Sequence, residues 1–127
     1  MSKPQRHKFR SDYELQVAKK LAEQGVKFEY EAHKITYVPK PKVYTPDFYL
    51  PEQGIYIEAK GFFSPSDRQK MLLVVQQNES LDIRMLFLRA SNKLNRSSKT
   101  TYGSWCDRHG ILWADGQIPP EWLEKKA

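Results

Sequence analysis

Two acidic residues and one lysine have the types and the spacing that phosphate chemistry requires. Asp47 and Glu58 lie in two segments that we predict as strands, 43–50 and 55–60, and Lys60 follows Glu58 by two positions. A four-residue loop with turn residues at both ends separates these segments, which predicts a hairpin. Alignment about this loop places Asp47 opposite Glu58, with their Cβ atoms about 5 Å apart. Lys60 should lie on the same face because side chains alternate along a strand.

Paired carboxylates of this kind predict a divalent metal site. Like charges that face each other destabilise a sheet unless a cation held by the carboxylate oxygens neutralises them. Mg²⁺ or Mn²⁺ lowers the pKa of a bound water and polarises a phosphoryl oxygen, while an ammonium stabilises charge that develops on phosphorus. Hydrolysis of a phosphodiester needs these parts. The structural alternative is a solvated surface on which Lys60 forms a simple ion pair with the two acids.

Length and composition restrict the partners that this chemistry can have. The chain has 127 residues and a mass of 14.9 kDa, which is the size of one domain. A net charge of +6 favours a polyanionic partner but leaves DNA, RNA and an acidic membrane open. The longest apolar run, 71–75, is too short to span a membrane, so we expect a cytoplasmic protein. The single cysteine, Cys106, excludes an internal disulfide and a thiolate zinc site.

The remaining elements follow from apolar periodicity and from capping and turn residues. We expect helices at 11–25, 66–77 and 101–109, and further strands at 26–31, 35–38, 83–88 and 111–114. These elements predict an α/β domain with a mixed, mainly antiparallel sheet flanked by helices. Glu14 has a structural explanation within the first helix, because Ser11 and Glu14 have capping-box spacing.

Basic residues gather in three segments that contain no acidic residue. They are an N-terminal arm at 1–10, a connector at 39–42 whose two prolines favour an extended spacer, and a loop at 89–99. Such segments favour phosphate contacts that do not depend on base sequence. The predicted DNA-binding residues are Arg6, Lys8, Arg10, Lys40, Lys42, Lys93, Arg96 and Lys99.

The acidic motif and its surroundings carry a resemblance to a known family. Thr45-Pro46-Asp47 followed by Ile57-Glu58-Ala59-Lys60-Gly61 resembles the signature of the PD-(D/E)xK nuclease superfamily. Further blocks in the same order resemble phage endonuclease I, a family of Holliday-junction resolvases. These blocks are Phe9-Arg10-Ser11, residues 24–31 (QGVKFEYE), 44–48 (YTPDF), 81–84 (LDIR), Tyr102-Gly103 and 118–122 (IPPEW).

The resemblance implies a restriction-endonuclease-like fold and a Mg²⁺-dependent or Mn²⁺-dependent enzyme, with two ions per active site and no small-molecule cofactor. Its substrates would be four-way and other branched DNA junctions, cut to leave 5′-phosphate ends in the cytoplasm of a phage-infected host. The resemblance also implies a homodimer that exchanges segments. Residues 11–127 would form one nuclease domain, and 35–44 would bridge the two lobes of the dimer.

Roles for individual residues also follow from the resemblance. Asp47 and Glu58 match metal ligands, with the carbonyl of Ala59 as a backbone ligand, and Lys60 matches the catalytic lysine. Glu14 matches a catalytic acid that the exchange would supply from the partner subunit. Glu29 matches an accessory acid. Two alternatives stay open: a non-catalytic basic module that binds nucleic acid, and a mismatch or restriction-type nuclease on the same core.

Overall fold

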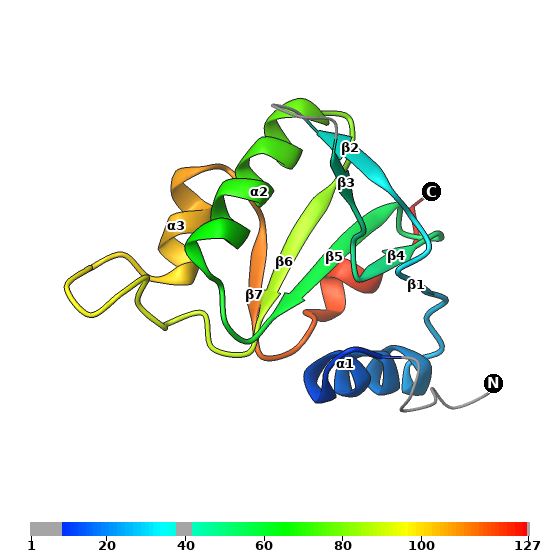
Figure 1. Ribbon diagram of the computed structural model, residues 1–127. Coiled ribbons are helices and arrows are strands. Elements are labelled where there is room, and N and C mark those ends of the chain that lie inside the picture. The colour runs from blue at the N-terminus through cyan, green and yellow to red at the C-terminus, as the bar shows by residue number, and fades with distance from the viewer. Residues whose placement is uncertain (1–8, 38–41, 127) are drawn as a thin grey trace.

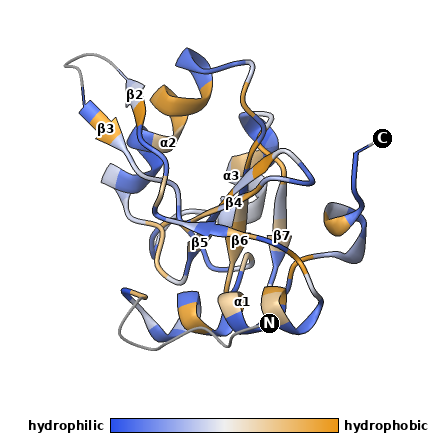
Figure 2. Ribbon diagram, turned by 90° about the vertical axis from the view of Figure 1, so that its right-hand side faces the viewer, coloured by the Kyte–Doolittle hydropathy of each residue, from blue (hydrophilic) through white to orange (hydrophobic). Residues whose placement is uncertain are grey.

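The computed structural model describes residues 9–37 and 42–126, which form three layers (Figure 1). A five-stranded sheet with the order β1-β4-β5-β6-β7 is the middle layer. Helix α1 covers one face, while α2, α3 and a two-stranded β2-β3 ladder cover the other (Figure 2). No helix in the described ranges is long and apolar enough to cross a membrane. In chain order the elements are α1 (Asp12–Glu23), β1 (Glu29–Tyr30), β2 (Ile35–Tyr37), β3 (Lys42–Tyr44), β4 (Phe48–Leu50), β5 (Ile55–Lys60), α2 (Pro65–Gln77), β6 (Ile83–Phe87), α3 (Tyr102–Arg108), β7 (Trp113–Asp115) and a 3₁₀ turn η2 (Pro120–Leu123).

All three predicted helices are confirmed, with ends within two residues of the predicted ones. Each helix begins at a hydroxyl side chain that accepts a hydrogen bond from a backbone amide of the first turn, which satisfies one of the unpaired donors there. The caps are Ser11 for α1, Ser64 for α2 and Thr101 for α3.

The predicted hairpin forms β4 and β5 with the expected register. Leu50 pairs with Ile55 and Phe48 pairs with Ile57, and Gly54 closes the turn with a φ of +71°. Strands β6 and β7 then join in parallel, each after a helix that returns the chain across the sheet. Three of the five ladders among the described residues are antiparallel, so the prediction of a mixed, mostly antiparallel α/β fold is confirmed.

Alternation along β5 divides its side chains between two apolar cores. Ile55, Ile57 and Ala59 pack in the core beneath α1. Tyr56 packs on the opposite side, in the core formed with α2 and α3. Because Lys60 has the same parity as Tyr56 and ion-pairs with α2, the lysine is directed toward the α2 side of the sheet.

Two predicted strands are wrong in extent. The strand expected at 43–50 breaks into β3 and β4, because Pro46 lacks the amide that a ladder needs. The strand expected at 26–31 contracts to Glu29–Tyr30. Its first residue, Val26, still donates its amide to the carbonyl of Leu21 in α1, and a φ of +50° at Glu31 ends the extended run.

The expected extended connector differs as well. Lys42 belongs to β3 and pairs with Tyr37 of β2, so the described residues of 35–44 fold back on themselves as an antiparallel ladder. Residues 39–41 of the connector lie outside the described part of the chain. The bridge between lobes, the segment exchange, the homodimer and the restriction-endonuclease-like classification stay predictions.

Candidate active site

An open cleft of about 570 Å³ lies at the carboxyl end of β5, bordered by the first turns of α1 and α2. All four residues predicted as catalytic line this cleft, namely Glu14, Asp47, Glu58 and Lys60. The fold therefore brings together residues that are separated by up to 46 positions along the chain.

Asp47 reaches the cleft because it lies just outside the β4-β5 ladder, one residue before Phe48, whose pairing with Ile57 is the last in the ladder at that end. The next amide on that edge of β5 belongs to Ala59, and Asp47 Oδ2 accepts its hydrogen bond at 2.9 Å. The Asp47 side chain thus replaces the missing backbone acceptor. Its own amide donates a longer bond, 3.4 Å, to Glu58 Oε1. Asp47 and Glu58 are therefore neighbours, as predicted, but they are not a cross-strand pair of the ladder.

Glu14 is buried, and its side chain is not used for capping α1. Its amide donates to Ser11 Oγ, which is half of the predicted capping box. The carboxylate instead accepts the backbone amide of Arg10 at 3.0 Å and the hydroxyl of Tyr30 at 2.8 Å, both at Oε1. These two donors fix the side chain at the cleft.

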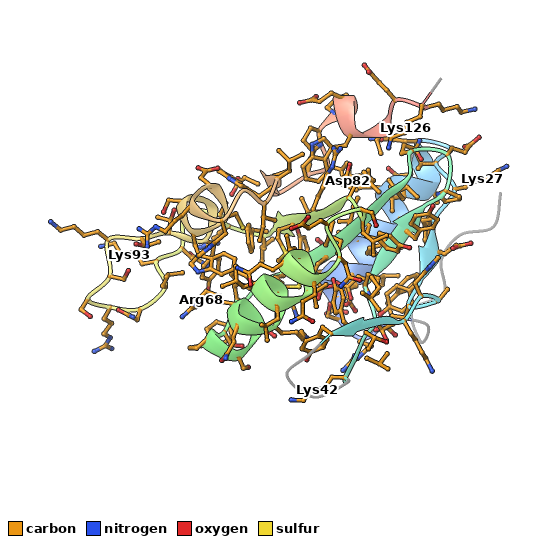
Figure 3. All side chains as sticks on the ribbon, turned by 90° about the horizontal axis from the view of Figure 1, so that it is seen from above. Lys27, Lys42, Arg68, Asp82, Lys93 and Lys126 are labelled. Atoms are coloured by element: carbon orange, nitrogen blue, oxygen red, sulfur yellow. The ribbon has the colours of Figure 1, made fainter. Side chains whose placement is uncertain are left out.

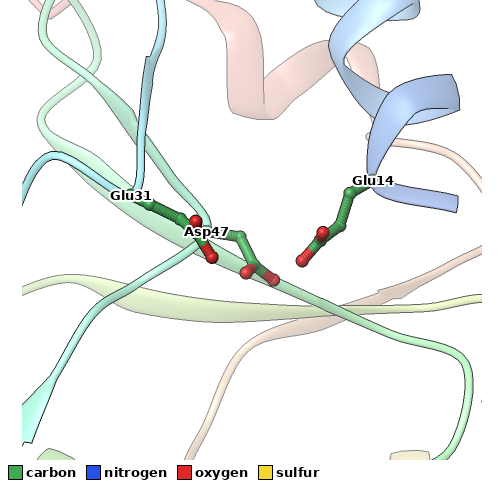
Figure 4. Close-up of side chains that lie close together, drawn as sticks. All are labelled: Glu14, Glu31 and Asp47. Carbon is green, nitrogen blue, oxygen red and sulfur yellow. The ribbon is translucent and has the colours of Figure 1, made fainter. Parts of the chain in front are cut away.

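A third acid, Glu31, joins Glu14 and Asp47. One carboxylate oxygen from each of these residues lies within 4.8 Å of the other two, and the three carboxylates point toward one another (Figure 4). The amide of Glu31 donates to the carbonyl of Asp47 at 3.0 Å, and its carboxylate lies 3.5 Å from the Arg10 guanidinium. Sequence reasoning did not identify Glu31 as a site residue.

The predicted accessory acid, Glu29, is not a member of this carboxylate cluster. Its carboxylate lies 2.5 Å from His33 Nε2, and its side chain is 45% exposed. Regular alternation would place Glu29 and Glu31 on one face of the strand. The positive φ of Glu31 breaks that alternation and turns its side chain toward Asp47.

Glu58 and Lys60 form the second part of the site. Glu58 Oε1 accepts the hydroxyl of the fully buried Tyr44 at 2.7 Å, and Oε2 lies 3.3 Å from Lys60 Nζ. Lys60 Nζ also lies 3.6 Å from Asp67 Oδ1. The other oxygen of Asp67 accepts the amide of Ser64 in the capping box of α2, so the cap of this helix also holds the lysine.

Burial and like charge shift the protonation of this site. Burial first, then the negative charges of Glu58 and Glu14, raise the pKa of Asp47 to about 10. Burial also raises the pKa of Glu58, although Lys60 and Tyr44 oppose that rise. Burial of Lys60 favours its neutral form, but the Glu58 and Asp67 carboxylates outweigh this effect and raise the pKa of Lys60. The site therefore contains a charged lysine together with acids whose ionised forms are disfavoured, because too little positive charge lies near them.

The donor set fits a divalent cation. Glu14, Glu31 and Asp47 offer hard oxygen ligands at close range, and a cation would remove the repulsion that raises the pKa of Asp47. Two predicted metal ligands stand beside this cluster rather than in it: Glu58 contacts the amide of Asp47, and Ala59 contacts its carboxylate. The roles of Glu58 and of the Ala59 carbonyl as metal ligands stay predictions.

The predicted DNA-binding residues within the described ranges are exposed. Arg10 pairs with Glu31 at the cleft, Lys42 begins β3, and the loop at 89–99 projects from the domain with Lys93 on it (Figure 3). A single bridge between Lys93 and Thr101 closes the base of this loop, and Arg96 and Lys99 are also exposed. Arg6, Lys8 and Lys40 lie outside the described residues.

Comparison with known proteins defines the class of this chain as an endonuclease. The model of the phage endonuclease I family matches residues 2–127. The chain is 46% identical to endonuclease I of Escherichia phage T7 over 119 residues, which cover 92% of this chain and 79% of the relative. It is 49% identical to endodeoxyribonuclease 1 of Enterobacteria phage T3 over 113 residues, 87% of this chain and 74% of the relative. The chain belongs to the phage endonuclease I family.

Proposed function

We propose that this protein is a metal-dependent DNA endonuclease that cuts four-way and other branched junctions and leaves 5′-phosphate ends. The observation that carries the proposal is the cluster of Glu14, Glu31 and Asp47 in one cleft with Lys60. The phage T3 relative is named an endodeoxyribonuclease, which supports DNA as the substrate. Exposed cations on separate segments support contact with the DNA backbone.

The cluster would hold Mg²⁺ or Mn²⁺ through its carboxylate oxygens, with Glu58 adjacent. A bound divalent ion supplies a water of lowered pKa and polarises a phosphoryl oxygen. Two ions per site are part of the proposal, because the acids extend from Glu31 across Asp47 to Glu58. The product requires water to attack phosphorus while the bond from phosphorus to the 3′ oxygen breaks, so the phosphate stays on the 5′ end.

The protein groups have separate tasks in this reaction. The ammonium of Lys60, held between Glu58 and Asp67, would stabilise negative charge that develops on the phosphoryl group. Asp47 and Ala59 hold each other by a hydrogen bond, which keeps the Asp47 carboxylate in place before any substrate binds. Preorganisation of this kind lowers the cost of reaching the transition state.

A homodimer with exchanged segments would give the enzyme two equivalent sites for the two strands of a junction. Glu14 precedes the β2-β3 ladder, whereas Asp47, Glu58 and Lys60 follow it. An opening of this ladder would therefore let α1 of one subunit supply Glu14 to the other. Junction recognition would depend on DNA shape and not on base sequence.

One experiment tests the whole proposal. A labelled four-way junction and its separate linear arms are incubated with the protein in Mg²⁺ or in EDTA, with Lys60→Ala as the inactive variant and Lys27→Ala as the exposed control outside the cleft. We expect cutting of the junction only in Mg²⁺, lost in Lys60→Ala and kept in Lys27→Ala. A DNA ligase should reseal the products, because it requires a 5′ phosphate.

Each component of the proposal has its own contrary outcome. Equal cutting of junction and linear arms would remove the junction preference and favour a general or restriction-type nuclease. Full cutting in EDTA would remove the metal. Tight binding without cutting in Mg²⁺ and in Mn²⁺ would leave a basic nucleic-acid-binding module.

A further inference from the structure

Three cations of the described residues line the cleft, and their surroundings differ. Arg10 lies 3.5 Å from Glu31, and Lys60 lies within 3.6 Å of both Glu58 and Asp67. Lys70 of α2 also lines the cleft, but no carboxylate of the described residues forms an ion pair with it. The residues outside the described ranges contain no Asp or Glu. Among the three cations, Lys70 is therefore the one that forms no ion pair with an acid of the described residues.

The position of Lys70 is fixed by its neighbours. It follows Asp67 by three residues, so both side chains lie on the same side of α2. Its ammonium lies 5.6 Å from the centre of the Tyr44 ring, within the range of a cation–π contact. The same ring carries the hydroxyl that donates to Glu58. Lys70 is also close enough to lower the pKa values of Glu58 and Asp67 through its charge, although burial of these two acids acts in the opposite direction.

We propose that Lys70 binds a backbone phosphate of the nucleic acid that enters this cleft. The inference rests on the proposed function only in taking DNA as the occupant. A phosphodiester that approaches five carboxylates needs a positive charge that is not already held in an ion pair, and Lys60 is paired with two acids. Lys70 meets that need because no described residue accepts a hydrogen bond from its ammonium and because Tyr44 already sets its position. Lysine contacts phosphate as a point charge, which demands no particular base sequence.

Salt dependence of DNA binding tests this assignment, because each phosphate contact releases counterions. Affinity for a four-way junction and for a linear duplex is measured in EDTA, which prevents metal-dependent cutting, between 50 and 200 mM salt. The variants are Lys70→Gln, Lys70→Arg and the control Lys27→Gln, whose lysine is exposed and does not line the cleft. Lys70→Met, which keeps an apolar stem over Tyr44, replaces the glutamine variant if that variant does not fold.

We expect Lys70→Gln to bind more weakly and to reduce the slope of log K against log salt by about 0.9. Its loss of affinity relative to wild type should then shrink by about 3.5-fold from 50 to 200 mM salt. Lys70→Arg and Lys27→Gln should keep the wild-type slope. An unchanged slope in Lys70→Gln, on a DNA that the wild type binds, would overturn the assignment and leave the proposed function intact. Equal wild-type affinity for junction and linear arms would contradict junction preference without bearing on Lys70.

Discussion

The replacement Asp47→Asn should stabilise the protein in EDTA while abolishing cleavage. Asp47 is 6% exposed, and burial together with Glu58 and Glu14 raises its pKa from 3.8 to about 10. Asparagine keeps the acceptor that Ala59 requires and carries no charge to bury. The variant therefore separates the cost of burying this acid from its use as a metal ligand.

The sign and size of the effect follow from proton binding. Above pH 3.8 the unfolded chain loses a proton that the folded chain keeps up to about pH 10, so the folded state binds more protons in this window. The free energy of unfolding then falls as pH rises, by about 1.4 kcal/mol per pH unit for one such proton. Between pH 5 and pH 8 this one residue should lower the free energy of unfolding of the wild type by up to about 4 kcal/mol. Residue 47 of the variant does not titrate, so the variant should not show this loss. Asp67 behaves in the opposite way. Burial raises its pKa, but the hydrogen bonds from Ser64 and the charge of Lys60 outweigh burial and lower it, so its charge stabilises the folded state above the pKa of the unfolded chain, and this stability is lost only on acidification.

Urea denaturation at pH 5, 6, 7 and 8 in EDTA measures this difference, with Asp107→Asn as the matched control. Asp107 is exposed and also accepts one hydrogen bond, from Trp113, that asparagine can keep. We expect the Asp47→Asn and wild-type curves to diverge toward pH 8, with the variant more stable. Mg²⁺ at 100 times its dissociation constant should stabilise the wild type by about 2.7 kcal/mol and the variant by much less. If stability depends on pH in the same way in all three proteins, the inference that the folded state disfavours the charged form of Asp47 is wrong.

Three further substitutions test the remaining assignments. Glu31→Gln should reduce Mg²⁺-dependent cleavage by about 10- to 100-fold, whereas Glu29→Gln should cleave at nearly the wild-type rate. The reverse result in the same cleavage assay would support Glu29 as the accessory acid. Asp67→Asn keeps an acceptor for the cap of α2 but removes the charge that holds Lys60 and stabilises the fold at neutral pH. Both kcat, by about tenfold, and the thermal midpoint should therefore fall, and a lower midpoint with unchanged kcat would show a purely structural role. Gly103→Ala would place a Cβ 2.7 Å from the Trp113 ring, so the free energy of unfolding in urea should fall by about 1 to 3 kcal/mol. Gly61→Ala, whose Cβ has no atom within 4 Å, should lower it less, and equal effects would contradict this packing.

Local sequence signals predicted the elements that carry most of the site. A four-residue loop with turn residues set the β4-β5 register, which places Glu58 and Lys60 on one side of β5. Hydroxyl caps fixed the beginnings of all three helices. Such features act over a few residues, so they can be recognised without knowledge of the rest of the fold.

The parts that were missed depend on backbone geometry or on distant packing. Pro46 removes Asp47 from the ladder, and the side chain then binds the Ala59 amide that the ladder leaves free. The positive φ of Glu31 is rare for a residue other than glycine, so strand alternation favoured Glu29 instead. Lys70 enters the cleft only because the chain returns from β5 through α2, and the composition of the helix does not indicate which edge of the sheet it borders.

The β2-β3 ladder divides the candidate site into two groups of residues. Glu14 and Glu31 precede it and are held together by Arg10, whose amide binds one acid and whose guanidinium binds the other. Asp47, Glu58 and Lys60 follow it and are linked through the hairpin of β4 and β5. In the exchange that we propose, an opened ladder would move the first group as a unit and re-form the same contacts with the second subunit. The acids of the first group cannot approach Asp47 without β1 pairing to β4, so the carboxylate cluster would form only in a correctly docked lobe.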